Sequence, residues 1–142
     1  MTRADATTRV QVLLCINIGY VQHAAVCIVS LLENNEDLEF EIVVVSTDEL
    51  GSEEVRLRQT LARYRNCTLT MRRLDASLAR DLPLRAHYSI DIYTRLWVSD
   101  FFGPDIDKVL YLDSDLVVTG PIEGLWHSSM GTISGNRRLT RG

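Results

Sequence analysis

The segment KVLYLDSDLVV, residues 108–118, decides how the rest of the chain is interpreted. Its first five residues are mostly apolar and predict a buried strand, and Asp113 and Asp115 follow directly after them. Two carboxylates this close repel one another unless a cation lies between them or water surrounds both. The segment therefore favours either a cation site at the end of a strand or a solvated polar turn.

The chain on either side of this segment alternates between strand patterns and helix patterns. Apolar runs with β-branched residues predict strands over 10–17, 40–46, 67–74 and 108–112, with a shorter one over 116–120. Apolar residues at helical spacing predict helices over 21–34, 52–65 and 89–102, and a brief helical piece within 121–126. Strands that alternate with helices are typical of an α/β fold with a mostly parallel sheet and right-handed crossovers.

Two of the predicted helices also carry features that indicate which face is buried and where they begin. The apolar face of the first is expected to consist of Ala25, Ile28, Val29 and Leu32. Ser52, followed by two glutamates, predicts the start of the second helix, and Arg63 and Arg65 lie near its expected end. Its buried side is expected to be formed by Leu57, Leu61 and Tyr64.

The predicted sheet gives the two aspartates at 113 and 115 a functional position. In an open α/β sheet, ligands bind beyond the carboxyl ends of the strands, and this pair follows the carboxyl end of strand 108–112. A second pair, Asp105 and Asp107, precedes the same strand and is therefore expected at the opposite edge, in water. In an extended segment the side chains of Asp113 and Asp115 would point the same way. Hard carboxylate oxygens suit Mg²⁺ or Mn²⁺, which also take phosphate oxygens, whereas an Asx-type turn remains the alternative.

Composition narrows the class of protein. The chain has 142 residues, 46% of them apolar, which suits one globular domain. Its net charge of −4 argues against broad nucleic-acid binding. The sequence contains no apolar run long enough to cross a bilayer, and its first residues do not resemble a signal peptide. Its three cysteines include no CxxC pair and are expected to be reduced thiols. A cytoplasmic location is therefore expected.

Other phosphate and metal motifs fit this sequence less well. Val117 falls where a calcium loop of the EF-hand type needs an oxygen ligand, and Val118 falls where it needs its glycine. P-loops and dinucleotide fingerprints need clustered glycines, whereas Gly19 stands alone. A phosphohydrolase of the haloacid dehalogenase type, with Asp113 as nucleophile, also has a strand that ends in D-x-D. That family places its pair near the chain start, so it is a weaker alternative.

Four segments together resemble glycosyltransferase family 8, which includes lipopolysaccharide galactosyl- and glucosyltransferases and glycogenin. The resemblance covers residues 10–126, and the segments are CINIGYVQHAAVCIVSLLENN (15–35), EIVVVSTDEL (41–50), HYSIDIYTRLWVSDFF (87–102) and DKVLYLDSDLVVTGPIEGLW (107–126). The implied fold is of the GT-A type, a Rossmann-like and mostly parallel α/β sheet with flanking helices, here incomplete. The implied activity is that of a hexosyltransferase that takes a UDP-sugar donor with Mn²⁺ or Mg²⁺ and retains anomeric configuration.

The same resemblance implies roles for individual residues at the donor end. Asp113 and Asp115 match the family's metal-binding pair, and Ser114 between them is a candidate for substrate binding. Tyr20 matches the aromatic residue that packs against uracil, a role that suits a flat amphipathic side chain. Asn17 stands where the family usually has an aspartate that contacts the base, and it is a departure from the pattern.

Two further candidates come from the third of these segments. Arg95 matches an arginine that reaches toward the donor's phosphate or sugar, a role that suits its guanidinium fork. The alternative is an i, i+4 ion pair with Asp91 on a helix surface. His87 matches a position near the acceptor edge, although by itself it is typical of a loop histidine.

The domain organisation follows from where these patterns begin and end. We expect a flexible tail over 1–9, a nucleotide-sugar-binding part over 10–126 and a disordered tail over 127–142. Members of the family continue with a further metal-binding histidine and acceptor contacts, so the chain is expected to be a fragment. The expected acceptor is a glycan or lipid-linked saccharide, and a full-length form could lie against the inner membrane. A non-catalytic remnant or interaction module remains the alternative function.

Overall fold

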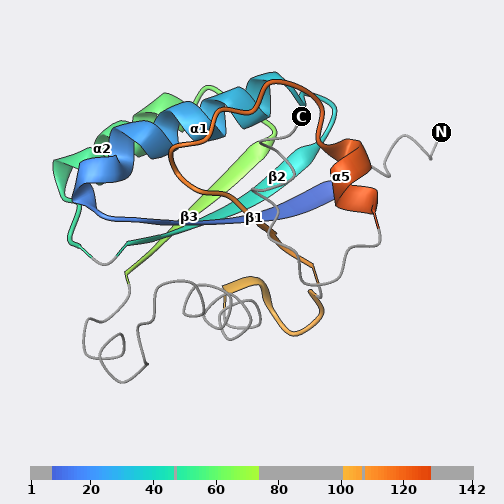
Figure 1. Cartoon of the computed structure of the whole chain (residues 1–142). Coiled ribbons are helices and arrows are strands. Elements are labelled where there is room, and N and C mark those ends of the chain that lie inside the picture. Colours follow the sequence, from blue (N-terminus) through green and yellow to red (C-terminus); the bar gives the residue numbers. More distant parts are fainter. Residues whose placement is uncertain (1–7, 47, 74–100, 107, 129–142) are drawn as a thin grey trace.

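The computed structural model describes residues 8–46, 48–73, 101–106 and 108–128, and it forms a sheet with helices packed on it (Figure 1). Along the chain the elements alternate between strands and helices, as the sequence predicted. They are β1 (Arg9–Ile16), the short 3-10 helix η2 (Ile18–Tyr20), α1 (Val21–Glu33), β2 (Glu39–Ser46), α2 (Ser52–Leu61), β3 (Cys67–Arg73), β4 (Leu110–Tyr111) and α5 (Glu123–His127). None of the helices within these ranges is long and apolar enough to span a membrane.

The four strands form one parallel sheet in the order β3-β2-β1-β4. β1 is central and pairs with β2 over its whole length, with Val12 opposite Ile42. On its other side β1 pairs with β4, where Val12 lies opposite Leu110. The predicted α/β fold with a parallel sheet is therefore confirmed. Its topology brings the carboxyl ends of β1 and β4 together, although about a hundred residues separate them in sequence.

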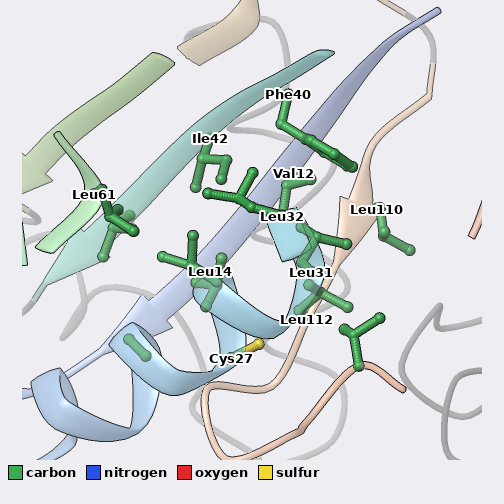
Figure 2. Close-up of a cluster of buried hydrophobic side chains, with 14 of the residues drawn as sticks. Val12, Leu14, Cys27, Leu31, Leu32, Phe40, Ile42, Leu61, Leu110 and Leu112 are labelled. Atoms are coloured by element: carbon green, nitrogen blue, oxygen red, sulfur yellow. The ribbon is translucent and has the colours of Figure 1, made fainter. Parts of the chain in front are cut away.

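One face of the sheet is covered by α1 and α2 and carries the main core. Figure 2 shows Leu31 and Leu32 of α1 against Val12 of β1 and Ile42 of β2, and all four side chains are fully buried. The buried stripe of α1 is turned slightly from the predicted face. Its fully buried members are Ala24, Cys27, Ile28, Leu31 and Leu32, while Ala25 and Val29 lie at its margin and are half-buried.

A second, smaller apolar cluster covers the other face of the sheet. Leu13, Val43 and Val45 are buried there, and Phe101 and Phe102 pack against them. Figure 1 shows residues 101–106 on the opposite side of the sheet from α1 and α2. Burial on both faces explains why β1 and β2 are continuous apolar runs and do not alternate with polar residues.

Several element boundaries differ from the predictions. α2 begins at Ser52, as predicted, with Gly51 at a positive φ of 54° as its N-cap, but it ends at Leu61, before Arg63 and Arg65. β1 begins at Arg9, within the predicted tail, and α5 extends to His127. The predicted helix 89–102 lies mostly outside the described residues, and so do most of residues 1–9 and 127–142.

The clearest error concerns the segment that follows the acidic pair. Residues 116–120 were predicted to form a strand, but the structure assigns them to no strand. The Val118 N–H donates to Ser30 Oγ at 2.8 Å, and its carbonyl accepts from Asn34 Nδ2 at 2.9 Å. Side chains of α1 therefore satisfy backbone groups that strand pairing would otherwise satisfy.

Candidate functional site

A pocket of about 390 Å³ opens at the carboxyl ends of β1 and β4. Its walls come from the end of β1, the loop that follows it and the acidic pair, defined here as Asp113 and Asp115. The lining residues are Cys15, Ile16, Asn17, Tyr20, Asp113, Ser114 and Asp115. Five of the residues singled out in the sequence therefore line one pocket. His87 and Arg95 lie outside the described residues.

The acidic pair lies in a turn, because the Leu116 N–H donates to the Asp113 carbonyl at 3.2 Å. The backbone of the pair therefore forms a turn, the alternative left open by the sequence, and not the extended segment. Asp113 and Asp115 nevertheless line the same pocket, and between them Ser114 is buried, with 6% of its surface exposed. The turn places two carboxylates at the pocket while Ser114 packs against the protein.

Sheet register brings Asp113 close to Cys15, because the Leu112 N–H donates to the Leu13 carbonyl at 3.0 Å. Burial, followed by the charge of Asp113, raises the pKa of the Cys15 thiol to about 12. Burial and then the charges of Asp115 and Asp113 likewise raise the pKa of Cys27 to about 12. Both thiols are free, in line with the expectation of reduced cysteines. They therefore stay protonated at neutral pH.

These thiols predict a loss of stability in alkaline solution. The folded chain holds both protons up to a pKa of about 12, whereas the ordinary value is 9.0, so their contribution is complete below pH 9. Between pH 9 and 12, each of Cys15 and Cys27 should lower the free energy of unfolding by about 1.4 kcal/mol per pH unit. Urea denaturation at pH 8 and pH 10 measures this loss. A Cys15→Ala, Cys27→Ala double variant should lose less between the two pH values, and an equal loss would contradict the assignment.

The loop after β1 presents Tyr20 to the pocket. Asn17 caps η2, its Oδ1 accepting from the Gly19 N–H at 2.9 Å, and the Tyr20 N–H donates to the Asn17 carbonyl at 3.0 Å. Tyr20 is 46% exposed, which is high for an aromatic ring, and its ring centroid lies 5.1 Å from that of His23. A partly exposed ring beside a polar pocket is suited to stacking on a planar ligand.

Asp48, which supports this site from outside the pocket lining, was missed by sequence reasoning. Its Oδ2 accepts from the Ile18 N–H at 2.9 Å, and Ser46 Oγ donates to its carbonyl at 2.7 Å. The loop after β2 is therefore hydrogen-bonded to the loop that carries Tyr20 and restrains its position. The available signal was its position, because Asp48 follows the carboxyl end of a strand adjacent to β1.

A second hollow of about 350 Å³ lies on the other side of the acidic turn. It is lined by Gln22, His23, Val26, Asp115, Leu116 and Val117. Asp115 borders both hollows, and the contact between Tyr20 and His23 links their walls. Asp115 of the acidic pair therefore contributes to the walls of both cavities.

The carboxylate oxygens of the acidic pair suit a hard divalent cation. Across the ranges that the structure describes, no group of three or more His, Cys, Asp or Glu side chains could hold a metal ion. Two carboxylates are nevertheless a sufficient protein contribution for Mg²⁺ or Mn²⁺, which usually complete their shells with water and substrate phosphates. The acidic pair fits an ion of this kind when it is shared with a phosphorylated ligand.

The family whose sequence profile matches residues 11–135 is Glycosyl transferase family 8. The chain belongs to this family. Among curated relatives, it is 32% identical over 107 residues to a lipopolysaccharide 1,2-glucosyltransferase of Escherichia coli, covering 75% of this chain and 31% of that protein. It is 29% identical over 139 residues to the probable galacturonosyltransferase-like 6 of Arabidopsis thaliana, covering 87% of this chain and 36% of the plant protein. The chain thus spans about a third of the length of these relatives.

Solved structures of glycosyltransferases confirm the fold. The galactosyltransferase LgtC in complex with donor and acceptor sugar analogs has a TM-score of 0.65 and 24% identity, covering 85% of this chain and 43% of LgtC. The bifunctional glycosyltransferase WbbM has a TM-score of 0.64 and 25% identity, covering 87% of this chain and 22% of WbbM. The GT-A fold implied by the resemblance is confirmed, and family membership disfavours the phosphohydrolase alternative.

Proposed function

We propose that this chain is the donor-binding part of a hexosyltransferase that binds a UDP-sugar together with Mn²⁺ or Mg²⁺. The observation that carries the proposal is one pocket at the carboxyl ends of β1 and β4 that Tyr20 and the acidic pair both line. A nucleotide diphosphate needs a flat surface for its base and a cation for its phosphates, and this pocket offers residues suited to each.

The uridine end of the donor is assigned to the loop after β1. Tyr20 stacks on the uracil ring, and the amide of Asn17, beside it in the pocket wall, hydrogen-bonds the base. Asn17 Oδ1 already accepts from the Gly19 N–H, so Asn17 also maintains the loop that presents Tyr20. Asp48 holds the same loop through the Ile18 N–H.

The diphosphate is assigned to the acidic pair, whose carboxylates would hold the cation. When bound, the ion neutralises the diphosphate and stabilises UDP as it leaves. The bond between the sugar's anomeric carbon and the diphosphate oxygen breaks, a bond to the acceptor hydroxyl oxygen forms with retention, and the hydroxyl proton passes to the departing diphosphate. The transition state has oxocarbenium character, as in other glycosyl chemistry.

The remaining predicted residues belong to the same proposal. Ser114 is assigned to donor binding from within the acidic turn, Arg95 to the donor's phosphate or sugar and His87 to the acceptor, the last two on the family resemblance alone. The acceptor is a glycan or lipid-linked saccharide, in a pathway such as lipopolysaccharide synthesis. This assignment is supported by the chain's similarity to a lipopolysaccharide 1,2-glucosyltransferase.

Removal of the Tyr20 ring tests the uridine end of the proposal. Tyr20→Ala should weaken UDP binding in the presence of Mn²⁺ by about 1–3 kcal/mol, the range for one stacked base, or roughly 5- to 150-fold in Kd. Isothermal titration calorimetry of the purified chain gives the Kd. Tyr20→Phe keeps the ring and should bind nearly as the unmodified chain does.

Two results would contradict the proposal. Equal UDP affinity of the Tyr20→Ala variant would remove the ring from the binding site. Absence of UDP and Mn²⁺ binding by the unmodified chain, together with concentration-dependent self-association, would favour the interaction module instead.

A further inference from the structure

Polar side chains at the carboxyl-terminal end of α1 and just after it bind the backbone of the chain beyond the acidic pair. Figure 1 shows the segment between β4 and α5 running alongside α1. Its residues 118, 120 and 122 each bond with a side chain at the carboxyl-terminal end of α1 or just after it. The side chains are those of Ser30, Asn34 and Asn35.

Ser30 uses its hydroxyl group as both donor and acceptor. Its Oγ donates to the Cys27 carbonyl at 2.7 Å and accepts from the Val118 N–H at 2.8 Å. The first bond holds the hydroxyl against its own helix, and this leaves an oxygen lone pair directed to the Val118 amide. Ser30 is therefore oriented by α1 to bind this one backbone group.

The two asparagines complete the attachment. Asn34 Nδ2 donates to the Ser30 carbonyl at 2.8 Å and to the Val118 carbonyl at 2.9 Å, so both polar groups of the Val118 backbone bond with α1. Asn35 is buried, with 2% exposed, and its Oδ1 accepts from the Ile122 N–H at 2.8 Å. Its Nδ2 donates to the Leu31 carbonyl at 2.9 Å and to the Gly120 carbonyl at 3.4 Å.

This attachment begins two residues after the hydrogen bond that closes the acidic turn. The turn is closed between the Leu116 N–H and the Asp113 carbonyl, which also accepts from Cys27 Sγ at 3.7 Å. On the side before the turn, β4 contributes two residues to the sheet. The turn is therefore held between a short strand on one side and the α1 side chains on the other.

We propose that Ser30 and Asn34 are positioning residues, which hold the acidic turn in the geometry that binds a divalent cation. The inference rests on the proposed function for the identity of the ligand, because Asp113 and Asp115 are the residues assigned to the ion. Groups that orient metal ligands from the outer shell commonly affect metal affinity by about 10- to 100-fold. Loss of either bond to Val118 releases the chain on one side of the turn.

The test compares variants of the full chain by two measurements. Ser30→Ala removes the hydroxyl, and Asn34→Asp removes the amide donor at similar size. Ser30→Thr keeps a hydroxyl at the same place and is the conservative variant. Mn²⁺ affinity is measured by electron paramagnetic resonance, with and without UDP. Amide hydrogen exchange at Leu116 and Val118 is measured by NMR without metal. Ser30→Ala and Asn34→Asp should weaken Mn²⁺ binding by about tenfold.

The exchange measurement separates a positioning role from a merely local one. In Ser30→Ala, the Leu116 amide should exchange about tenfold faster, as the Val118 amide does, because the turn opens with the segment. Ser30→Thr should keep both the Mn²⁺ affinity and the Leu116 exchange rate close to those of the unmodified chain. Thr60→Ala is the matched control, since Thr60 on α2 makes a similar bond to the Arg56 carbonyl at 2.9 Å and should leave both readouts unchanged.

The possible failures are distinguishable. Faster exchange at Val118 with unchanged exchange at Leu116 would overturn the proposal, because the bonds would then hold the segment without holding the turn. Mn²⁺ binding that is normal in both Ser30→Ala and Asn34→Asp would overturn this inference alone. Absence of Mn²⁺ binding in the unmodified chain would overturn the proposed function, and the cation part of this inference with it.

Discussion

Asparagine in place of Asp113 should reduce Mn²⁺ affinity by about 100-fold or more, since even loss of outer-shell partners can cost that much. The substitution keeps the size of the side chain and removes one of the two carboxylates that line the pocket. Asp115→Asn should have a similar effect, because the two charges act on the same ion. UDP binding should weaken with it in calorimetric titrations that contain Mn²⁺.

Asp105 provides the matched control for this experiment. It belongs to an Asp-x-Asp pair of the same spacing, but it precedes β4 and is not among the residues that line the pocket. Asp105→Asn should leave Mn²⁺ and UDP affinity unchanged. Equal effects of Asp105→Asn and Asp113→Asn would mean that general negative charge, and not a localised site, attracts the ion.

Truncation of Leu112 should produce the largest loss of stability near the site. Leu112 directly precedes Asp113 and is fully buried in the core between α1 and the sheet (Figure 2). Leu112→Ala removes buried methyl groups and leaves a cavity, so the free energy of unfolding should fall by about 2–5 kcal/mol. Urea denaturation followed by circular dichroism measures the change.

Val117, on the other side of the acidic pair, is the control for that substitution. It is 58% exposed, so Val117→Ala should change stability by no more than about 0.5 kcal/mol. If Leu112→Ala cost no more than Val117→Ala, Leu112 would not belong to the cooperative core, and the assigned packing of the strand before the site would be wrong.

The parts of the fold that depend on local pattern were predictable from the sequence. Continuous apolar runs over 10–17 and 40–46 correspond to β1 and β2, and helical spacing over 21–34 corresponds to α1. The position of the acidic pair followed from a general property of parallel sheets, whose carboxyl ends face the ligand. Tyr20 and the acidic pair line one pocket, while the donor-binding roles that the family resemblance implied for them stay predictions.

The features that sequence reasoning missed depend on contacts between distant positions. Residues 116–120 have the composition of a strand, but Ser30 and Asn34 bind the Val118 backbone from 88 and 84 positions away. Asp48 bonds with Ile18 across 30 positions, and one strand pattern gives no sign of that bond. A turn at the acidic pair was one of the two alternatives for this segment, but the bond that closes it, from the Leu116 N–H to the Asp113 carbonyl, was not predicted.

The shortness of β4 has a consequence for how the molecule unfolds locally. β1, β2 and β3 share long parallel ladders, whereas β4 pairs with β1 at Leu110 and Tyr111, followed by one bond from the Leu112 N–H to the Leu13 carbonyl. The edge that bears the acidic pair should therefore detach at a lower free energy than the three-stranded remainder, as an independent opening unit. A ligand that binds at this edge would reduce the population of these locally open states. Proteolytic cleavage at the edge should then slow markedly, while the melting temperature of the whole chain rises only slightly.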